Sequence, residues 1–122
     1  MRYDHRHQRG GMAYRNLDVL EAAEHAADLV NRLIDQSPRR LLHVRQLRNS
    51  VQSVCANISE GFGRGKGRDR DRPLEIARGE TEETIRHLGA NFRSRRIDAK
   101  DYWPVHNLLV VIGKMLNALL YR

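Results

Sequence analysis

Four segments of the chain carry apolar or small residues at alternating intervals of three and four positions, and this spacing constrains the fold most strongly. It places the side chains on one stripe of an α-helix, as at the core positions of packed helices. The four stripes are Leu20, Ala23, Ala27, Val30 and Ile34; Val44, Leu47, Val51, Val54 and Ile58; Leu74, Ala77, Thr81, Thr84 and Leu88; and Val105, Leu108, Ile112, Met115 and Leu119. No stretch alternates with a period of two, so we expect no strands. The pattern predicts an all-α, antiparallel, up-down-up-down four-helix bundle.

Prolines and glycines indicate where the helices end. Ser37 precedes a proline and therefore avoids the helical region, which ends the first helix. Gly61 suits the position just past the end of the second helix, and Pro73 suits the first turn of the third. The predicted helices span about 16–36, 40–60, 73–93 and 98 onward, with a Gly-rich loop over 61–72.

The sequence shows no signal for export or membrane insertion. Residues 1–15 are basic and lack apolar periodicity, so we expect a disordered arm before a bundle domain at 16–122. The longest apolar run is about five residues, against the roughly 20 that a membrane span needs. The single cysteine, Cys55, excludes an internal disulfide, and we expect a cytoplasmic protein.

The last helix carries a second set of apolar residues beside its stripe. A bundle needs only one buried stripe per helix. We therefore expect the extra set to form the subunit interface of a homo-oligomer. Its members are Leu109, Val111, Leu116 and Leu120.

The net charge of +7 is unevenly distributed. Residues 16–37 carry −4, whereas 38–60 and 61–73 carry +3 each. A basic surplus favours polyanionic partners such as nucleic acid. The alternative is an ordinary solvated surface.

The Gly-rich loop is the first candidate site for binding a polyanionic partner. A phosphate-binding P-loop needs Ser or Thr after the Gly-Lys pair and follows a strand, whereas here Gly67 follows Lys66 and the loop leaves a helix. A flexible basic loop that contacts a phosphate backbone fits better, since Arg suits phosphate oxygens. A solvated connector with local Asp–Arg pairs is the alternative. The candidate residues are Arg64, Lys66, Arg68, Arg70 and Arg72.

A second group of candidates lies on the helices. Arg45 and Arg48 either extend the basic surface or form ion pairs with acids of the first helix. The acids expected to pair with them are Glu21, Glu24 and Asp28. Arg78 begins a stripe along the third helix that is either functional or neutralised by neighbouring glutamates. The other members of this stripe are Arg86 and Arg93.

The sequence gives little support for a catalytic site or a metal site. Di-iron bundles need Glu-x-x-His pairs, a spacing that is absent. His43 lies three helical turns from Cys55, which is too far for a nucleophile–base pair. We therefore interpret Cys55 as a small buried apolar residue. We expect no catalytic residues, metal or cofactor. Tyr102 and Trp103 either stack on bases or cover the end of the bundle.

Three segments resemble a known family. They are QLRNSVQSVCANISEGFGR (46–64), IARGETEETIRHL (76–88) and IGKMLNALL (112–120), and they are similar to the bacterial 23S rRNA intervening-sequence proteins. The resemblance implies an antiparallel bundle that assembles into a ring, commonly a pentamer, with no known catalytic residues. The similar accessory variability determinant of diversity-generating retroelements is a basic pentamer that binds nucleic acid and a reverse transcriptase.

Taken together, these features predict a non-enzymatic homo-oligomer whose basic surface binds RNA or other structured nucleic acid. The alternative is a protein–protein adaptor that docks an acidic partner, such as a nucleic-acid enzyme of the reverse-transcriptase kind.

Overall fold

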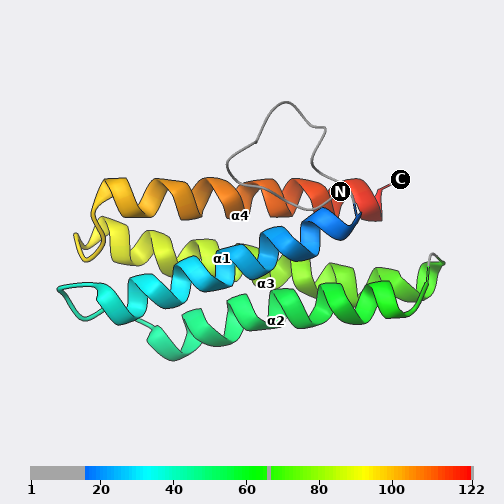
Figure 1. Ribbon diagram of the computed structural model, residues 1–122, viewed down its shortest axis with the longest axis horizontal. Helices are drawn as coiled ribbons and strands as arrows, with labels where there is room; N and C mark the ends of the chain where they lie inside the picture. Colours follow the sequence, from blue (N-terminus) through cyan, green and yellow to red (C-terminus); the bar gives the residue numbers. More distant parts are fainter. Residues whose placement is uncertain (1–15, 66, 122) are drawn as a thin grey trace.

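The computed structural model describes residues 16–65 and 67–121, so the predicted arm and Lys66 lie outside the described residues. Within these ranges the chain forms four α-helices, a short 3-10 helix and no strands. They are α1 (Asn16–Gln36), α2 (Val44–Gly63), η2 (Arg68–Arg70), α3 (Asp71–Arg93) and α4 (Ala99–Leu120). The α-helices run alternately in opposite directions (Figure 1). The predicted four-helix bundle is confirmed.

Each α-helix packs against its neighbours in the chain, and α1 packs against α4 to close the bundle. The α2–α3 pair has the most extensive contact. The predicted stripes of these two helices are confirmed, since their members are buried except for the half-buried Val44. The two buried threonines of α3 are satisfied: Thr81 donates to the Ala77 carbonyl, and Thr84 Oγ1 lies 2.7 Å from Ser50 Oγ.

The stripe predicted for α1 is partly wrong. Leu20, Ala27 and Ile34 are only half-buried, at the edge of the core. The helix is rotated relative to the prediction, which turns its small residues inward and allows its backbone to approach its neighbours closely. Its buried residues are Val19, Ala22, Ala23, Ala26 and Val30.

The expected second face of α4 requires a correction. Leu109 and Leu116 are completely buried inside the single chain, so they cannot form a surface for another subunit. Val111 and Leu120 are half-buried against the same core. Because α4 packs on both α3 and α1, its two apolar sets form one broad buried face. The pattern that suggested a subunit interface is thus explained within one chain.

Among the described residues, α4 has the length and apolar composition that would suit a membrane span. The core helix of a soluble bundle meets the same criterion. Seven residues of α4 are buried in the bundle, which accounts for this composition: Tyr102, Val105, Leu108, Leu109, Ile112, Met115 and Leu116.

The helices separate two ends of the molecule (Figure 1). We call one the double-turn end, because the α1–α2 turn (37–43) and the α3–α4 turn (94–98) lie there together. The other is the loop end, where residues 64–70 connect α2 to α3. The 20 residues of α2 separate these ends by about 30 Å.

Candidate nucleic-acid interface

At the loop end, Gly61 is part of α2 and does not cap it. A Cβ atom at Gly61 would lie 2.9 Å from Leu74 Cδ2 and 3.3 Å from the Arg70 carbonyl oxygen. The glycine therefore permits the last turns of α2 to pack closely against the start of α3. Gly65, with φ of 87°, adopts the left-handed conformation after the helix. The predicted loop is consequently shorter, because α2 extends to Gly63 and α3 begins at Asp71.

Several loop-end arginines already have roles within the chain. Arg64 forms an ion pair with Glu60, with 3.0 Å between Nη2 and Oε1, and also donates to the Asp69 carbonyl. Arg70 is only 6% exposed, so its predicted role as a phosphate contact is wrong. Its carbonyl oxygen lies beside Gly61, near the C-terminal end of α2. Of the described loop candidates, Arg68 and Arg72 remain exposed without such an ion pair.

Arg78 holds α3 against the end of α4. Its Nη1 atom donates to Asn117 Oδ1 at 3.1 Å and to the Tyr121 hydroxyl at 2.7 Å. Its guanidinium carbon lies 5.4 Å from the centroid of the Tyr121 ring, a cation–π distance. The hydrogen bond to Tyr121 raises the pKa of Arg78 above its ordinary value. These contacts give Arg78 a structural role between helices.

Arg45 and Arg48 lie at the opposite end from the loop candidates. Arg48 donates to Asn31 Oδ1 at 2.6 Å and pairs with Asp35 Oδ1 at 2.8 Å, which joins α2 to α1. Antiparallel packing brings Arg48 beside the C-terminal half of α1, so the acids expected nearer its N-terminus are not its partners. Arg45 is exposed. The predicted binding residues that the structure describes therefore do not form one surface.

The arginine stripe of α3 is interrupted by a carboxylate. Glu83 pairs with Arg86 and lies 2.8 Å from His87 Nε2. The hydrogen bond from Arg86 lowers the pKa of Glu83. Arg93, at the C-terminal end of the helix, forms no ion pair with the described residues and belongs to the double-turn end.

The double-turn end depends on a residue that the sequence analysis missed. The Asn91 side chain is fully buried; its Oδ1 accepts from the Leu42 N–H at 2.6 Å, and its Nδ2 donates to the Leu42 carbonyl at 3.0 Å. Nδ2 also donates to the His87 carbonyl. Asn91 follows Leu88 by three positions, so a polar residue that continues the α3 stripe was the signal available in the sequence.

Hydrogen bonds also join the two turns directly. Ser37 Oγ donates to the Arg96 carbonyl at 3.2 Å, and Arg96 Nη1 donates to the Arg40 carbonyl at 2.8 Å. Arg39 donates to the carbonyl of Arg95, whose φ of 60° is left-handed. These bonds hold the backbones of both arginine-bearing turns together.

Among the described residues, the double-turn end therefore exposes more arginines without an ion pair than the loop end does. Residues 37–43 and 93–98 together carry five arginines and one aspartate. Four of these arginines are exposed, namely Arg39, Arg40, Arg93 and Arg95. Their guanidinium groups form no ion pair within the described part of the chain.

Aromatic rings cover the core at this end. Tyr102 is 6% exposed and stacks on Phe92, with 4.1 Å between ring centroids. Its hydroxyl lies 3.1 Å from His106 Nδ1. Trp103 contacts Phe92 and His106 edge-on but remains 46% exposed. Tyr102 therefore covers the bundle end, whereas Trp103 is accessible.

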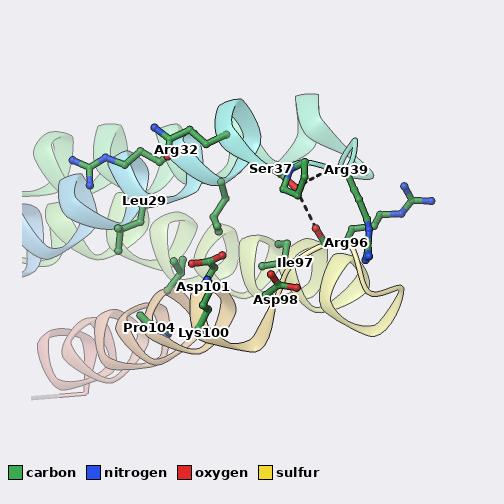
Figure 2. Close-up of a pocket in the computed structure, with 14 residues that line it drawn as sticks. Leu29, Arg32, Ser37, Arg39, Arg96, Ile97, Asp98, Lys100, Asp101 and Pro104 are labelled. Carbon is green, nitrogen blue, oxygen red and sulfur yellow. Dashed lines mark hydrogen bonds between the residues drawn. The ribbon is translucent and has the colours of Figure 1, made fainter.

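Two clefts lie on either side of the α3–α4 turn. One, of about 400 Å³, separates the C-terminal half of α1 from the first turns of α4 (Figure 2). It has apolar walls such as Leu29 and Leu33, and both cations and acids at its rim, among them Arg32, Lys100 and Asp101. The other, of about 460 Å³, is lined by Arg39, Phe92, Arg93, Arg95, Ile97, Asp98 and Ala99. The lining residues of each cleft carry a surplus of two cations over acids, but the second cleft has fewer lining residues, so cations make up a larger share of them.

Comparison with known proteins agrees with this architecture. The family model of the 23S rRNA-intervening sequence protein matches residues 15–118. The chain belongs to this family. A crystal structure from Bacteroides thetaiotaomicron, of a protein with unknown function from the S23 ribosomal protein family, has the same fold. Its TM-score is 0.77 at 24% identity, covering 88% of this chain and 98% of that chain. No curated protein matches the chain.

In this intervening-sequence protein, the one thiol is poorly suited to nucleophilic chemistry. Burial, with a contribution from the charge of Glu24, raises the pKa of Cys55 to about 11. Such a thiol is protonated at neutral pH and reacts slowly. Within the described residues, 16–65 and 67–121, no group of three or more His, Cys, Asp or Glu residues could hold a metal ion. The described surface presents exposed guanidinium groups and an exposed indole, both of which suit binding.

Proposed function

We propose that this intervening-sequence protein is a non-enzymatic homo-oligomer whose basic surface binds RNA or other structured nucleic acid. The observation that carries the proposal is the gathering of five arginines at the double-turn end, four from the two turns and one from the last residue of α3, against one aspartate in residues 37–43 and 93–98. The binding surface is therefore centred on this end, away from the glycine-rich loop.

The arrangement suits a phosphate backbone for two reasons. Guanidinium groups bind phosphate oxygens with two parallel hydrogen bonds, and several of them together release counterions on binding. The cross-turn hydrogen bonds of Ser37, Arg39 and Arg96 hold the backbone in place before the partner arrives. Less conformational freedom is then lost on association.

Oligomerisation would multiply this surface. Around a ring, each copy contributes one basic end, and linked contacts raise the overall affinity. The pentamer is suggested by the family resemblance. Exposed apolar side chains away from the basic end, such as Ile76 at 41% exposure, are candidates for contact between copies. Light scattering at micromolar concentration tests this part, and a mass near 14.2 kDa, that of one chain, would contradict it.

The test of binding is a fluorescence-anisotropy titration of a labelled structured RNA and of duplex DNA at about 50 and 200 mM salt. We expect binding that weakens steeply with salt, with a slope near −0.9 per phosphate contacted on the duplex. No binding at the lower salt concentration would reject the proposal. A protein that co-purifies from the native host despite nuclease treatment would then favour the adaptor function.

A further inference from the structure

We propose that the cleft lined by Arg93 and Arg95 binds the phosphates of an unpaired nucleotide, whose base stacks on the neighbouring Trp103. This inference rests on the proposed function and specifies its ligand as a single-stranded segment of nucleic acid.

The first observation is the contrast between two adjacent aromatic residues. Tyr102 is buried and completes the core, whereas Trp103 leaves 46% of its surface exposed. The indole is nevertheless held in position, since it contacts Phe92 at 5.7 Å and His106 at 5.1 Å between ring centroids. An exposed ring with a fixed position loses little freedom when a base stacks on it.

The second observation is the cationic cleft next to this ring. Phe92 lines the cleft of about 460 Å³ and contacts Trp103 edge-on, so the indole lies just outside the cleft lining, next to Phe92. The volume lies within the range of small-molecule sites and leaves room for phosphate groups. Arg93 and Arg95 line the same cleft, and Asp98 is the one acid among its lining residues. The balance of charge therefore favours phosphate.

The geometry of Arg95 supports this role. Its backbone is held in a left-handed conformation, its N–H donates to the Phe92 carbonyl at 3.0 Å, and its carbonyl accepts from Arg39. The backbone is thus engaged while the side chain remains exposed. Arg93, the last residue of α3, also lines the cleft, and its guanidinium lies over Gly89, one turn earlier in the helix.

An indole on the surface of a helix selects for unpaired bases. In a duplex, the base faces are stacked on one another and cannot reach a protein ring, whereas loops and free ends expose them. Stacking tolerates every base, because each has a π-face. We therefore expect a preference for single-stranded over duplex nucleic acid without strong sequence preference.

The chain contains one tryptophan and four tyrosines, so fluorescence excited at the long-wavelength edge, where tyrosine absorbs little, reports on Trp103. The experiment titrates the full-length protein with an oligouridylate of about ten nucleotides and with an abasic oligomer of equal length and charge. We expect oligouridylate to quench the fluorescence and the abasic oligomer to leave it nearly unchanged. The abasic oligomer should also bind about tenfold more weakly, because it lacks the stacking contact.

Two variants test the contribution of the Trp103 ring to binding. By anisotropy with labelled oligomers, W103A should lose about tenfold in affinity for oligouridylate and nothing for the abasic oligomer, while W103F should retain most of the binding. Tyr121→Ala is the matched control, since Tyr121 is 72% exposed at the other end, and its affinity should equal that of the wild type.

The outcomes separate this inference from the proposed function. Binding of both oligomers with equal affinity and no quenching would overturn base stacking and leave phosphate binding intact. No binding of any nucleic acid at low salt would overturn both. Fluorescence that changes with protein concentration but not with oligouridylate would place Trp103 in a contact between copies and reject the stacking site.

Discussion

The two ends of the bundle show how little the number of cations in a segment says about the charge available for binding. The loop end has the denser run of basic residues in the sequence, yet Arg64 is paired with Glu60 and Arg70 is buried. The double-turn end takes its arginines from two turns far apart in the chain. There, hydrogen bonds from side chains engage backbone carbonyls, and most guanidinium groups remain exposed.

The ends also differ in how their connections are held. At the double-turn end, the buried Asn91 amide pairs with the backbone of Leu42, and the two turns are bonded to each other. At the loop end, close packing of Gly61 on Leu74 holds α2 against α3. Hydrogen bonds therefore hold the connections at the double-turn end, whereas close packing at a glycine holds the helices at the loop end. Substitutions should accordingly destabilise the two ends for different reasons.

The largest expected effect on stability is at Asn91. Asn91→Ala leaves the Leu42 N–H and C=O without their partner, which should lower the free energy of unfolding by about 3 kcal/mol. Urea denaturation at fixed protein concentration measures the change. Asn49→Ala, at an exposed position of α2, is the control and should change stability by less than about 0.5 kcal/mol. Equal midpoints for both variants would show that the amide does not hold this end.

At the loop end, Gly61→Ala should destabilise the protein by about 2 kcal/mol, because its Cβ would press against Leu74 and the Arg70 backbone. The substitution does so although alanine favours helix formation. Gly79→Ala is the matched control in α3, where a new Cβ meets nothing within 4 Å, and it should stabilise by about 0.5–1 kcal/mol. Thermal denaturation of both variants shows whether each substitution lowers or raises the stability. A stabilised Gly61→Ala variant would contradict the close approach.

The contrast in charge is tested by neutralising two arginines at each end. Arg93→Gln with Arg95→Asn, where asparagine tolerates the left-handed backbone, should weaken RNA binding about tenfold. On duplex DNA, the salt slope should become shallower by about 1.8, for two lost phosphates. Arg68→Gln with Arg72→Gln should weaken binding less than about threefold. The reverse ranking would move the interface to the loop end.

The smallest effect concerns the ion pair between α1 and α2. Arg48→Met should cost about 0.5–1 kcal/mol, because the Arg48 and Asp35 side chains are 41% and 64% exposed and solvent screens their attraction. Arg45→Met, one turn away and exposed, should be near neutral. The difference between the two variants in urea denaturation should shrink in about 1 M salt. A difference that persists would assign the loss to the Asn31 hydrogen bond instead.

Local patterns in the sequence predicted much of the fold. The observed limits of α1, Asn16–Gln36, equal the predicted ones, and the stripes of α2 and α3 are buried as expected. Periodicity of this kind depends only on residues within a few turns of one another. The same is true of Pro73, which lies in the first turn of α3 as predicted. The family resemblance was also found in the sequence and is confirmed.

The candidate site was less predictable, because its parts depend on contacts between distant segments. Gly61 resembles a helix cap in sequence, and only the position of Leu74 shows that it permits close packing. The apolar residues of α4 suggest two faces until the helix is placed against both α1 and α3. In the same way, Arg48 meets Asp35 because antiparallel packing sets which turns of α1 and α2 lie side by side.

The sequence by itself thus determined four amphipathic helices, their approximate limits, the family and a basic net charge. The tertiary structure decided which arginines are engaged within the chain and which are exposed, and it brought two distant turns and Trp103 to one end. The physical reason is that helical periodicity is a local property of the backbone. Exposure and pairing of a charged side chain depend on neighbours that only packing supplies.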